Sequence, residues 1–392
     1  MTRDINIELS PQIRQDFPKR LQNARKICGF SQAELATQMG NLAKDMPYIY
    51  KGVSSTAIER YEKGIMFPES DKIMATLAIA LKTNVYDLIR PFTVEVDCSK
   101  FEFRKKAKLG KKAIEAIKLK IQQHIEKYVE IERIANAEMK FDIDIVSDIL
   151  VKDETSARQA AMKLRKIWKL GMGPLSQPIL ILESYGVKVI EVEEDPELFD
   201  GTSNVVEGIP VLVLNKKDNN SPDSKYQNNE ERRRLTLFHE LGHQVMHFSE
   251  EVDDKRKEDL CNVFASEMLI PSDTFINIFG SKRSMISSWE LKDVQREFGI
   301  SVRALMMKAV QLGVISTNRY KWFCITLNKK ENQAFREKLD ETAISTQHTS
   351  RFARLVYRSL ASEVITTSKA AQLLDIPVTK VKENICFDLT NY

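Results

Sequence analysis

The chain has few cysteines, and no stretch of it is apolar enough to suggest a membrane span. Its five cysteines are widely spaced and form no Cys-x-x-Cys pair. An odd, scattered set argues against a disulfide framework and a cysteine-rich zinc site, and favours reduced thiols. No apolar run approaches the roughly 18 residues that span a bilayer, and the N-terminus lacks a signal-peptide core. We therefore expect a soluble cytoplasmic protein without a membrane partner.

The net charge of the chain is also small. Lys and Arg number 59 against 55 Asp and Glu, an excess too small to identify a nucleic-acid partner by itself. The length of 392 residues and the hydrophobic content of 43% allow roughly two to four domains with their own cores.

Histidine is rare as well, but three of the five histidines fall within nine residues. His239, Glu240 and His243 form the motif His-Glu-x-x-His, and His247 follows. On a helix, the i, i+4 spacing puts His239 and His243 on one face, where they can bind one zinc ion. Glu240 is then placed to act as general base on a zinc-activated water. A chance match is the alternative, but the surrounding apolar residues predict a buried helix in which imidazoles need partners.

A catalytic zinc site needs a third protein ligand. A straight helix cannot bring His247 to the same ion as the other two histidines, so we expect a packing role or a supporting role around the ligands for it. The next apolar-periodic segment, 258–271, offers Glu258 and Glu267; the alternative for Glu267 is a solvent-facing position. Cys261 has suitable chemistry but lies in an apolar stretch, which favours a small core residue.

The sequence from His239 onward resembles the ImmA/IrrE family of zinc metallopeptidases. The resemblance rests on His-Glu-Leu-Gly-His, followed by Glu-Asp-Leu-Cys-Asn-Val-Phe-Ala-Ser-Glu-Met-Leu-Ile-Pro. It implies a zincin-like α+β core with a small sheet, and Glu258 as the third zinc ligand. Asn262 lies one helical turn after Glu258 and is expected to orient a zinc-binding histidine.

The N-terminal part predicts five short helices. Ser31 is a candidate N-cap with Glu34 at the capping-box position, and Gly64 ends a later helix. The order and spacing of three stretches resemble the Xre-type helix-turn-helix domain. These are Ser31-Gln32-x-Glu34-Leu35-Ala36, Val53-Ser54-Ser55-Thr56-x-Ile58-x-Arg60-Tyr61-Glu62-x-Gly64 with Pro68, and Ala78-x-Ala80-Leu81.

In such a domain the second helix of the motif enters the major groove of operator DNA. The residues that we expect to contact DNA are Gln32, Ser54, Ser55, Thr56 and Arg60. Glu62 is interpreted as a structural contact. The connection 41–52 is longer than usual, so protein contacts are the alternative to DNA binding. The symmetry of most such operators suggests a homodimer.

We expect a mainly α-helical, multi-domain chain of five segments. They are a flexible arm (1–16), the Xre-type helix-turn-helix DNA-binding domain (17–92), a basic helical linker (93–155), the zinc metallopeptidase domain (156–330) and a C-terminal helical module (331–392). The basic cluster 105–112 of the linker either faces solvent or adds phosphate contacts. In the last segment, Ser368-Lys369-Ala370-Ala371-x-Leu373-Leu374 suggests either a helix-turn-helix-like fold or a docking module.

Local patterns complete the expectations. We expect strands at 187–192, 210–215 and 322–327. The resemblance to thermolysin-like sites implies that an exposed strand edge near the helix of His239 and His243 pairs with an extended substrate. A purely structural strand is the alternative. The segments 216–230 and 341–350 are polar, and we expect both to be mobile.

The family resemblance implies a zinc endopeptidase that cleaves an Xre-type repressor, either a separate protein or its own helix-turn-helix region. Cleavage would derepress stress, prophage or mobile-element genes. One alternative is a transcriptional regulator or antitoxin-like protein whose zinc domain is sensory or structural. Another is a protein-interaction scaffold. Glu240 favours the peptidase, because a structural zinc site needs no carboxylate beside a water.

Overall fold

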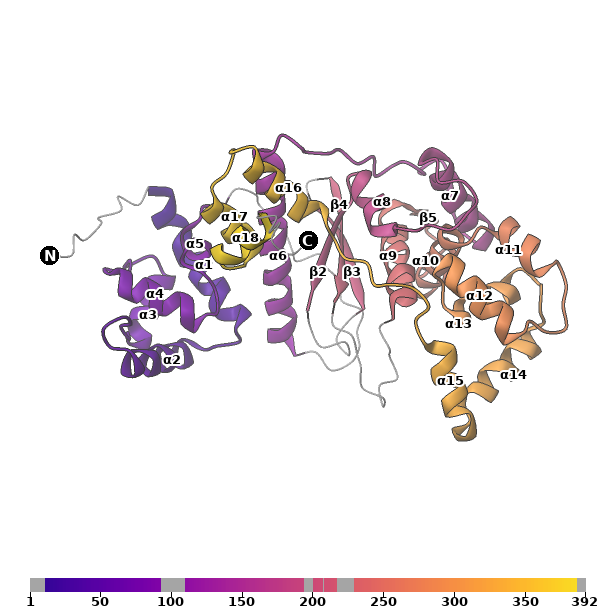
Figure 1. Ribbon diagram of the computed structural model, residues 1–392, viewed down its shortest axis with the longest axis horizontal. Helices are drawn as coiled ribbons and strands as arrows, with labels where there is room; N and C mark the ends of the chain where they lie inside the picture. Colours follow the sequence, from indigo (N-terminus) through magenta and orange to yellow (C-terminus); the bar gives the residue numbers. More distant parts are fainter. Residues whose placement is uncertain (1–10, 93–109, 194–199, 207, 217–228, 386–392) are drawn as a thin grey trace, which may run out of the picture. The chain divides into compact units, whose positions relative to one another are not determined.

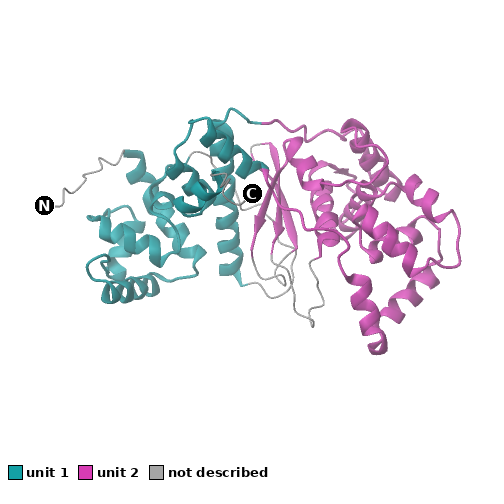
Figure 2. Cartoon of the chain, in the orientation of Figure 1, with its two compact units in different colours: residues 1–99, 108–138, 351–392 teal, residues 100–107, 139–350 magenta. Residues whose placement is uncertain are grey.

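The computed structural model describes residues 11–92, 110–193, 200–206, 208–216 and 229–385. The chain is mainly helical and forms two compact units (Figures 1 and 2). The first unit combines residues 1–99, 108–138 and 351–392, and the second combines 100–107 and 139–350. The segment expected at 331–392 therefore contributes to both units.

The first unit begins with the five predicted short helices. They are α1 (Pro11–Ile27), α2 (Gln32–Asp45), α3 (Ser55–Glu62), α4 (Asp71–Ala80) and α5 (Val85–Ile89). Ser31 caps α2 with the predicted capping box to Glu34. The expectation of a loose arm up to residue 16 is wrong for residues 11–16, which are the first turns of α1. Proline is well tolerated there, because the first helical position has no intrahelical N–H partner.

Three C-terminal helices and one long helix complete this unit. They are α6 (Lys111–Ile134), α16 (Arg351–Ala361), α17 (Thr367–Leu374) and α18 (Val378–Ile385). Isoleucines of α6 at 117, 121 and 125 recur at helical spacing and are buried. Within the expected basic cluster 105–112, residues 105–109 lie outside the described residues.

A buried ion network joins α6 to the N-terminal helices of the same unit. Glu126 of α6 is 0% exposed and forms ion pairs with Arg20 of α1 and with Arg90, the latter at 2.9 Å. Lys127 forms a second ion pair with Asp87 of α5 at 3.2 Å. Because these charges have left water, each depends on its partners to remain ionised at low cost.

The second unit is organised around a three-stranded sheet and two packed helices. The sheet contains β2 (Lys188–Val192), β3 (Gly201–Val206) and β4 (Ile209–Asn215) in the order β2-β4-β3. β4 is parallel to β2 and antiparallel to β3. The strands predicted at 187–192 and 210–215 are confirmed, whereas β3 was not predicted. Because β4 is central, β2 and β3 are the two edge strands of the sheet. The edge strand next to the helix that carries His239 and His243 is β3.

Helices make up most of the rest of the second unit. They are α7 (Glu154–Ile167), α8 (Pro178–Ser184), α9 (Glu230–Val245), α10 (Asp254–Leu269), α11 (Ser272–Phe279), α12 (Ser288–Phe298) and α13 (Val302–Gln311). Phe238, Leu241 and Phe264 belong to the continuous apolar core shared by α9 and α10. A two-stranded parallel pair, β1 (Leu150–Val151) with β5 (His247–Phe248), lies beside the end of α9.

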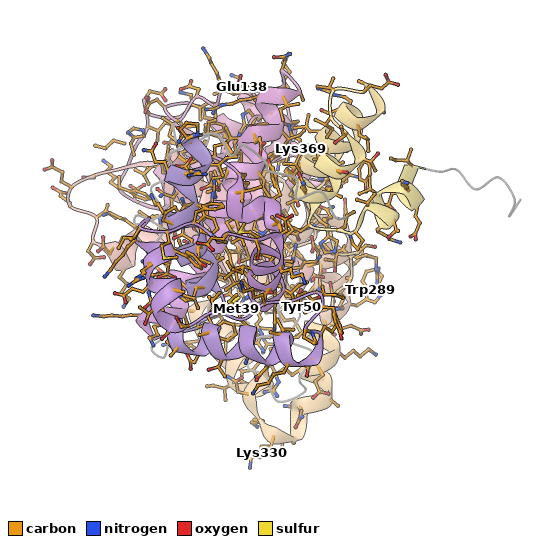
Figure 3. All side chains as sticks on the ribbon, turned by 90° about the vertical axis from the view of Figure 1, so that its left-hand side faces the viewer. Met39, Tyr50, Glu138, Trp289, Lys330 and Lys369 are labelled. Carbon is orange, nitrogen blue, oxygen red and sulfur yellow. The ribbon has the colours of Figure 1, made fainter. Side chains whose placement is uncertain are left out.

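The strand expected at 322–327 is wrong, because these residues belong to α14 (Thr317–Asn328). Ser316 caps this helix by accepting a hydrogen bond from the amide of Arg319. Leu327 is buried, and Phe323, one turn earlier, packs against the same core. The short 3-10 turn η2 (Lys330–Asn332) leads into α15 (Gln333–Asp340). Lys330 marks this outer turn in Figure 3.

Residues 341–350, which we call the connecting segment, are anchored rather than mobile, so the expectation for them is wrong. Buried Glu231 of α9 accepts hydrogen bonds from the Thr342 hydroxyl at 2.8 Å and the Ala343 amide at 2.7 Å. Glu191 of β2 accepts from His348 at 3.0 Å. Burial alone would raise the pKa of Glu191, but hydrogen bonds from Arg233 and His348 hold it below its usual value. The other expected mobile loop, 216–230, lies outside the described residues from 217 to 228.

None of the described helices is both long enough and apolar enough to cross a membrane.

Candidate functional site

Helix α9 carries the His-Glu-x-x-His motif into the core of the second unit. Asn229 caps the helix by accepting a hydrogen bond from the amide of Arg232 at 2.9 Å. Glu230 and Glu231 follow in the first turn, where negative side chains interact favourably with the positive end of the helix dipole. The helix ends at Val245. His239 and Glu240 are only 2% and 6% exposed, so both side chains depend on partners inside the protein.

Three side chains converge on one point beside α9. The Nε2 atoms of His239 and His243 are 3.0 Å apart. The two carboxylate oxygens of Glu258, on α10, lie 3.4 Å from His239 Nε2 and 3.1 Å from His243 Nε2. Atoms at about 2.0–2.2 Å from a tetrahedral zinc ion are roughly 3.3–3.6 Å apart, close to these distances. Two imidazoles and one carboxylate therefore fit a zinc ion in both chemistry and spacing.

The orientation of His239 is fixed from its other side. Its Nδ1 lies 2.9 Å from the side-chain oxygen of Asn262, on the next turn of α10. This oxygen accepts a hydrogen bond, so Nδ1 carries the proton and Nε2 keeps its lone pair for a metal. The side chains of His243 and Glu258 are 25% and 40% exposed, so the cluster opens to solvent on their side.

The other candidate ligands have different surroundings. Cys261 is fully buried in the core, and its sulfur lies within 4.8 Å of the histidine nitrogens. It is thus a further donor near the two histidines, from inside the core, whereas Glu258 reaches them from the side that is open to solvent. His247 is beyond the end of α9 and pairs with Asp144 at 3.2 Å.

Glu267 does not face solvent, as the alternative interpretation of it expected. It is 2% exposed and accepts from Lys308 at 2.6 Å and from the Ser272 amide at 2.7 Å. These contacts make it a buried structural carboxylate. Burial lowers the pKa of Lys308, although the ion pair with Glu267 opposes this shift.

Glu240 is held by side chains that the motif does not contain. The Ser203 hydroxyl of β3 donates to Glu240 Oε2 at 2.8 Å, and the Gln244 amide donates to the Ser203 oxygen at 2.8 Å. This chain of two hydrogen bonds fixes one carboxylate oxygen of Glu240. Hydrogen bonds to a charged acceptor contribute roughly 1.5–3 kcal/mol, so Ser203 is a positioning residue for Glu240.

One face of α9 lies along β3. This face consists of every fourth residue of the helix, from Arg232 through Thr236 and Glu240 to Gln244. Arg232 pairs with Asp200 at 2.6 Å. A Cβ at Gly201 would lie 2.6 Å from the Thr236 side chain, so only glycine allows this approach. Glu240 and Gln244 continue the row at Ser203. The i, i+4 spacing that aligns the histidines thus also aligns a neighbouring row with the edge strand.

Ser203→Ala should reduce peptidase turnover roughly tenfold, because Glu240 loses the hydrogen bond that positions it. The zinc content should stay near wild type. The comparison of kcat with KM on a peptide substrate, together with metal analysis, checks this result. Ser203→Thr, which keeps the hydroxyl, should restore most of the turnover. A variant with unchanged kcat would show that Ser203 has no positioning role.

The residues expected to contact DNA lie in the first unit. Ser54 is the N-cap of α3, and Ser55, Thr56 and Arg60 are exposed on that helix. The Gln32 amide donates to Glu62 at 2.9 Å. Glu62 also accepts two hydrogen bonds from Arg25, at 2.6 and 2.7 Å, so its interpretation as a structural contact is confirmed.

The site geometry can now be compared with known proteins. Residues 182–309 match the family Peptidase_M78, described as the IrrE N-terminal-like domain. The match contains β2 to α12 and most of α13, including both helices of the ligand cluster. It supports the ImmA/IrrE family and a metallopeptidase domain for this part of the chain. A comparison with curated proteins finds no match.

Proposed function

We propose that the chain is a zinc-dependent endopeptidase with a DNA-binding domain. The observation that carries the proposal is the convergence of His239, His243 and Glu258 beside the buried carboxylate of Glu240. The IrrE N-terminal-like match over the same residues supports it. His239, His243 and Glu258 would hold the ion, with Asn262 orienting His239.

A bound zinc ion supplies a Lewis acid that polarises a carbonyl and lowers the pKa of a water to roughly 7. Glu240 takes a proton from the attacking water and passes it to the leaving amine. Ser203 and Gln244 keep the Glu240 carboxylate in position for both transfers. The edge strand β3 is hydrogen-bonded to this constellation through Ser203, and its outer edge would hold an extended substrate by strand addition.

We further propose that the substrate is an Xre-type repressor, and that its cleavage derepresses the genes it controls. Incubation of the zinc-loaded protein with repressors encoded beside its gene tests this directly. We expect defined fragments, identified by mass spectrometry, that disappear when a chelator is added before the repressor. Intact repressors at all zinc concentrations would contradict the choice of substrate.

DNA binding is proposed for the exposed face of α3. Arg60→Ala should weaken the binding of duplex DNA from the promoter of the protein's own gene roughly 5- to 100-fold, because an arginine contact to a base edge contributes about 1–3 kcal/mol of discrimination. Peptidase turnover should not change. Lys338→Ala, an exposed residue of α15 in the second unit, is the matched control for the loss of one positive charge. Equal affinity of Arg60→Ala and wild type at each salt concentration would contradict the assignment.

A further inference from the structure

The C-terminal end of the first unit contains two short helices joined by a tight turn. α17 and α18, each eight residues long, are joined by the three residues 375–377. Asp375 ends α17 in the left-handed conformation, with φ of 55°, a conformation that aspartate tolerates better than most residues. Two short helices joined by a three- to four-residue turn define the helix-turn-helix motif.

The packing of this motif leaves the second helix exposed. α16 and α17 bury Val356, Ala370 and Leu373 against Tyr128 and Ile131 of α6. α18 contributes only Val381 to this core. A helix that serves only to pack normally buries three or four residues in every two turns. Beside Val381, the Asn384 amide donates to the Tyr357 hydroxyl of α16 at 2.6 Å, and Lys380 pairs with Glu383 of the same helix at 3.0 Å. All residues of α18 except Val381 are exposed within the described part of this unit.

The exposed face of α18 suits DNA. Val378, Thr379 and Lys380 are exposed in its first turn, and Lys382 is exposed one residue beyond Val381. Hydroxyl and ammonium groups donate hydrogen bonds to base edges and phosphates, and an apolar side chain can contact the thymine methyl group. Residues 351–385 contain six Lys and Arg against three Asp and Glu, a balance that favours a polyanion.

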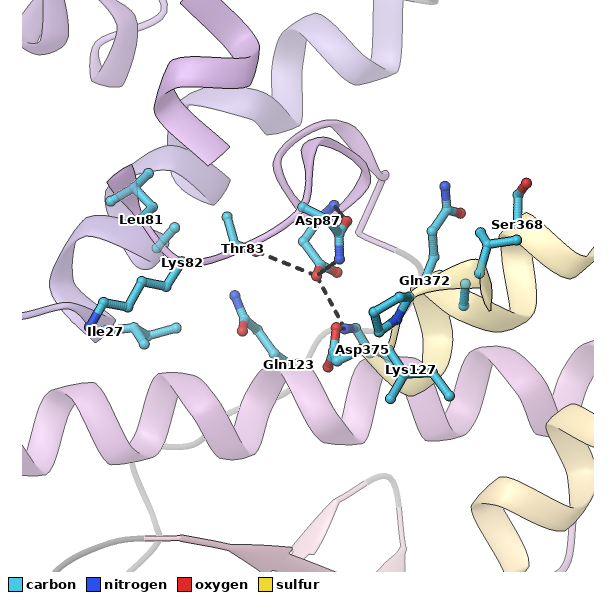
Figure 4. Close-up of a pocket in the computed structure, with 16 residues that line it drawn as sticks. Ile27, Leu81, Lys82, Thr83, Asp87, Gln123, Lys127, Ser368, Gln372 and Asp375 are labelled. Atoms are coloured by element: carbon cyan, nitrogen blue, oxygen red, sulfur yellow. Dashed lines mark hydrogen bonds and ion pairs between the residues drawn. The ribbon is translucent and has the colours of Figure 1, made fainter. Parts of the chain in front are cut away.

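The motif is also firmly attached to the N-terminal helices of its unit. Lys127 of α6 bonds to Asp375 in the turn at 2.5 Å and to Asp87 of α5 at 3.2 Å (Figure 4). Lys369 of α17 bonds to Tyr86 of α5 and to Glu130 of α6. A cavity of about 670 Å³ lies between these elements, and Asp375, Asp87 and Lys127 line it (Figure 4). The turn before α18 is thus fixed against the domain that contains α3.

We propose that α18 is a second DNA-reading helix, so that the first unit binds duplex DNA at two subsites, through α3 and through α18. The N-terminal turn of α18 would enter the major groove, where Thr379 and Lys380 read base edges and Lys382 contacts a phosphate. The inference shares its ligand class with the DNA binding proposed above, but it does not require peptidase activity.

A selection experiment tests the two subsites separately. The full-length protein is incubated with a random duplex library of about 40 base pairs, roughly four helical turns, and the bound fraction is sequenced. We expect wild type to select two motifs at a fixed spacing. Thr379→Ala/Lys380→Ala should lose one of them and bind the selected duplex roughly 10- to 100-fold more weakly. Arg60→Ala should lose the other motif, and Lys338→Ala should keep both.

The outcomes separate the two proposals. If the α18 variant selects the wild-type sequences with equal affinity, the second subsite is refuted and α18 is a protein-docking helix. If Arg60→Ala changes nothing while the α18 variant abolishes binding, the proposal for α3 fails and that for α18 stands. No selection by wild type refutes both. Hydrogen exchange of the α17 peptides confirms that the α18 variant is folded; if it is not, Lys380→Gln alone, which keeps the length of the side chain, replaces it.

Discussion

Glu240→Gln should lower the rate of repressor cleavage by about 10²- to 10⁴-fold, the usual contribution of a general base, while leaving zinc binding intact. Glutamine keeps the size of the side chain and still accepts the hydrogen bond from Ser203, but it cannot take a proton from water. Glu240 is not among the three converging ligand groups, so the metal should be retained.

The measurement combines fragment appearance over time with the zinc content of the purified variant. Glu337→Gln, an exposed carboxylate on α15, is the matched control and should cleave at the wild-type rate. If Glu240→Gln cleaves normally, another group is the base. If it loses zinc together with activity, Glu240 is a ligand and the assignment of Glu258 is wrong. If it loses gene regulation but no proteolysis is found in wild type, the domain is sensory rather than catalytic.

Glu126→Gln should destabilise the first unit by about 3–5 kcal/mol, the range found when one partner of a buried ion pair is removed. Arg20 and Arg90 would then remain buried without the charge that both contact. Burial already lowers the pKa of Arg20, with the nearby Arg90 adding to this effect and Glu126 opposing it. Removing Glu126 takes away the strongest opposing contribution and leaves the smaller one from Asp87 against burial and Arg90.

Hydrogen exchange of peptides from α1, α5 and α6 measures the loss of stability within the first unit. Tryptophan fluorescence is an internal control, because Trp168, Trp289 and Trp322 all lie in the second unit. The midpoint of the unfolding transition that it reports should be the same as in wild type. Glu115→Gln tests the same change on an exposed position of the same helix, where Glu115 pairs with Lys26 at 2.9 Å. An effect within about 1 kcal/mol is expected there. Equal effects of the two substitutions would contradict the importance of burial.

The sequence predicted those parts of the candidate site that depend on helical spacing. The i, i+4 separation of His239 and His243 requires only a helix. The choice of Glu258 over Glu267 rested on the family resemblance, because the packing of α10 against α9 joins residues that are distant in sequence. The structure places Glu258 and Asn262 beside the histidines. Gln244, four residues after Glu240, could have been found by the same rule. Ser203 could not, because its contact joins residues 37 positions apart.

Other errors arose where tertiary packing outweighed local preference. The stretch 322–327 is rich in aromatic and β-branched residues, which favour strands, yet capping by Ser316 and burial of Leu327 make it helical. For Glu267 the sequence offered a zinc ligand or a solvent-facing residue, and the structure shows neither, because its carboxylate is buried against Lys308. Its partner Lys308 is 41 residues away, and no local pattern indicates such a pair.

The assembly of the first unit from three separate stretches of chain bears on whether the protein could act on itself. A single cut between α5 and α6 would leave two polypeptides still joined by the contacts of Glu126 with Arg20 and Arg90 and of Lys127 with Asp87. A molecule cut at this point would therefore keep helices α1–α5 bound to α6. If the protein cut itself, a second event would have to break these ion pairs before α1–α5 could separate from the rest of the chain. A separate repressor is therefore the simpler target.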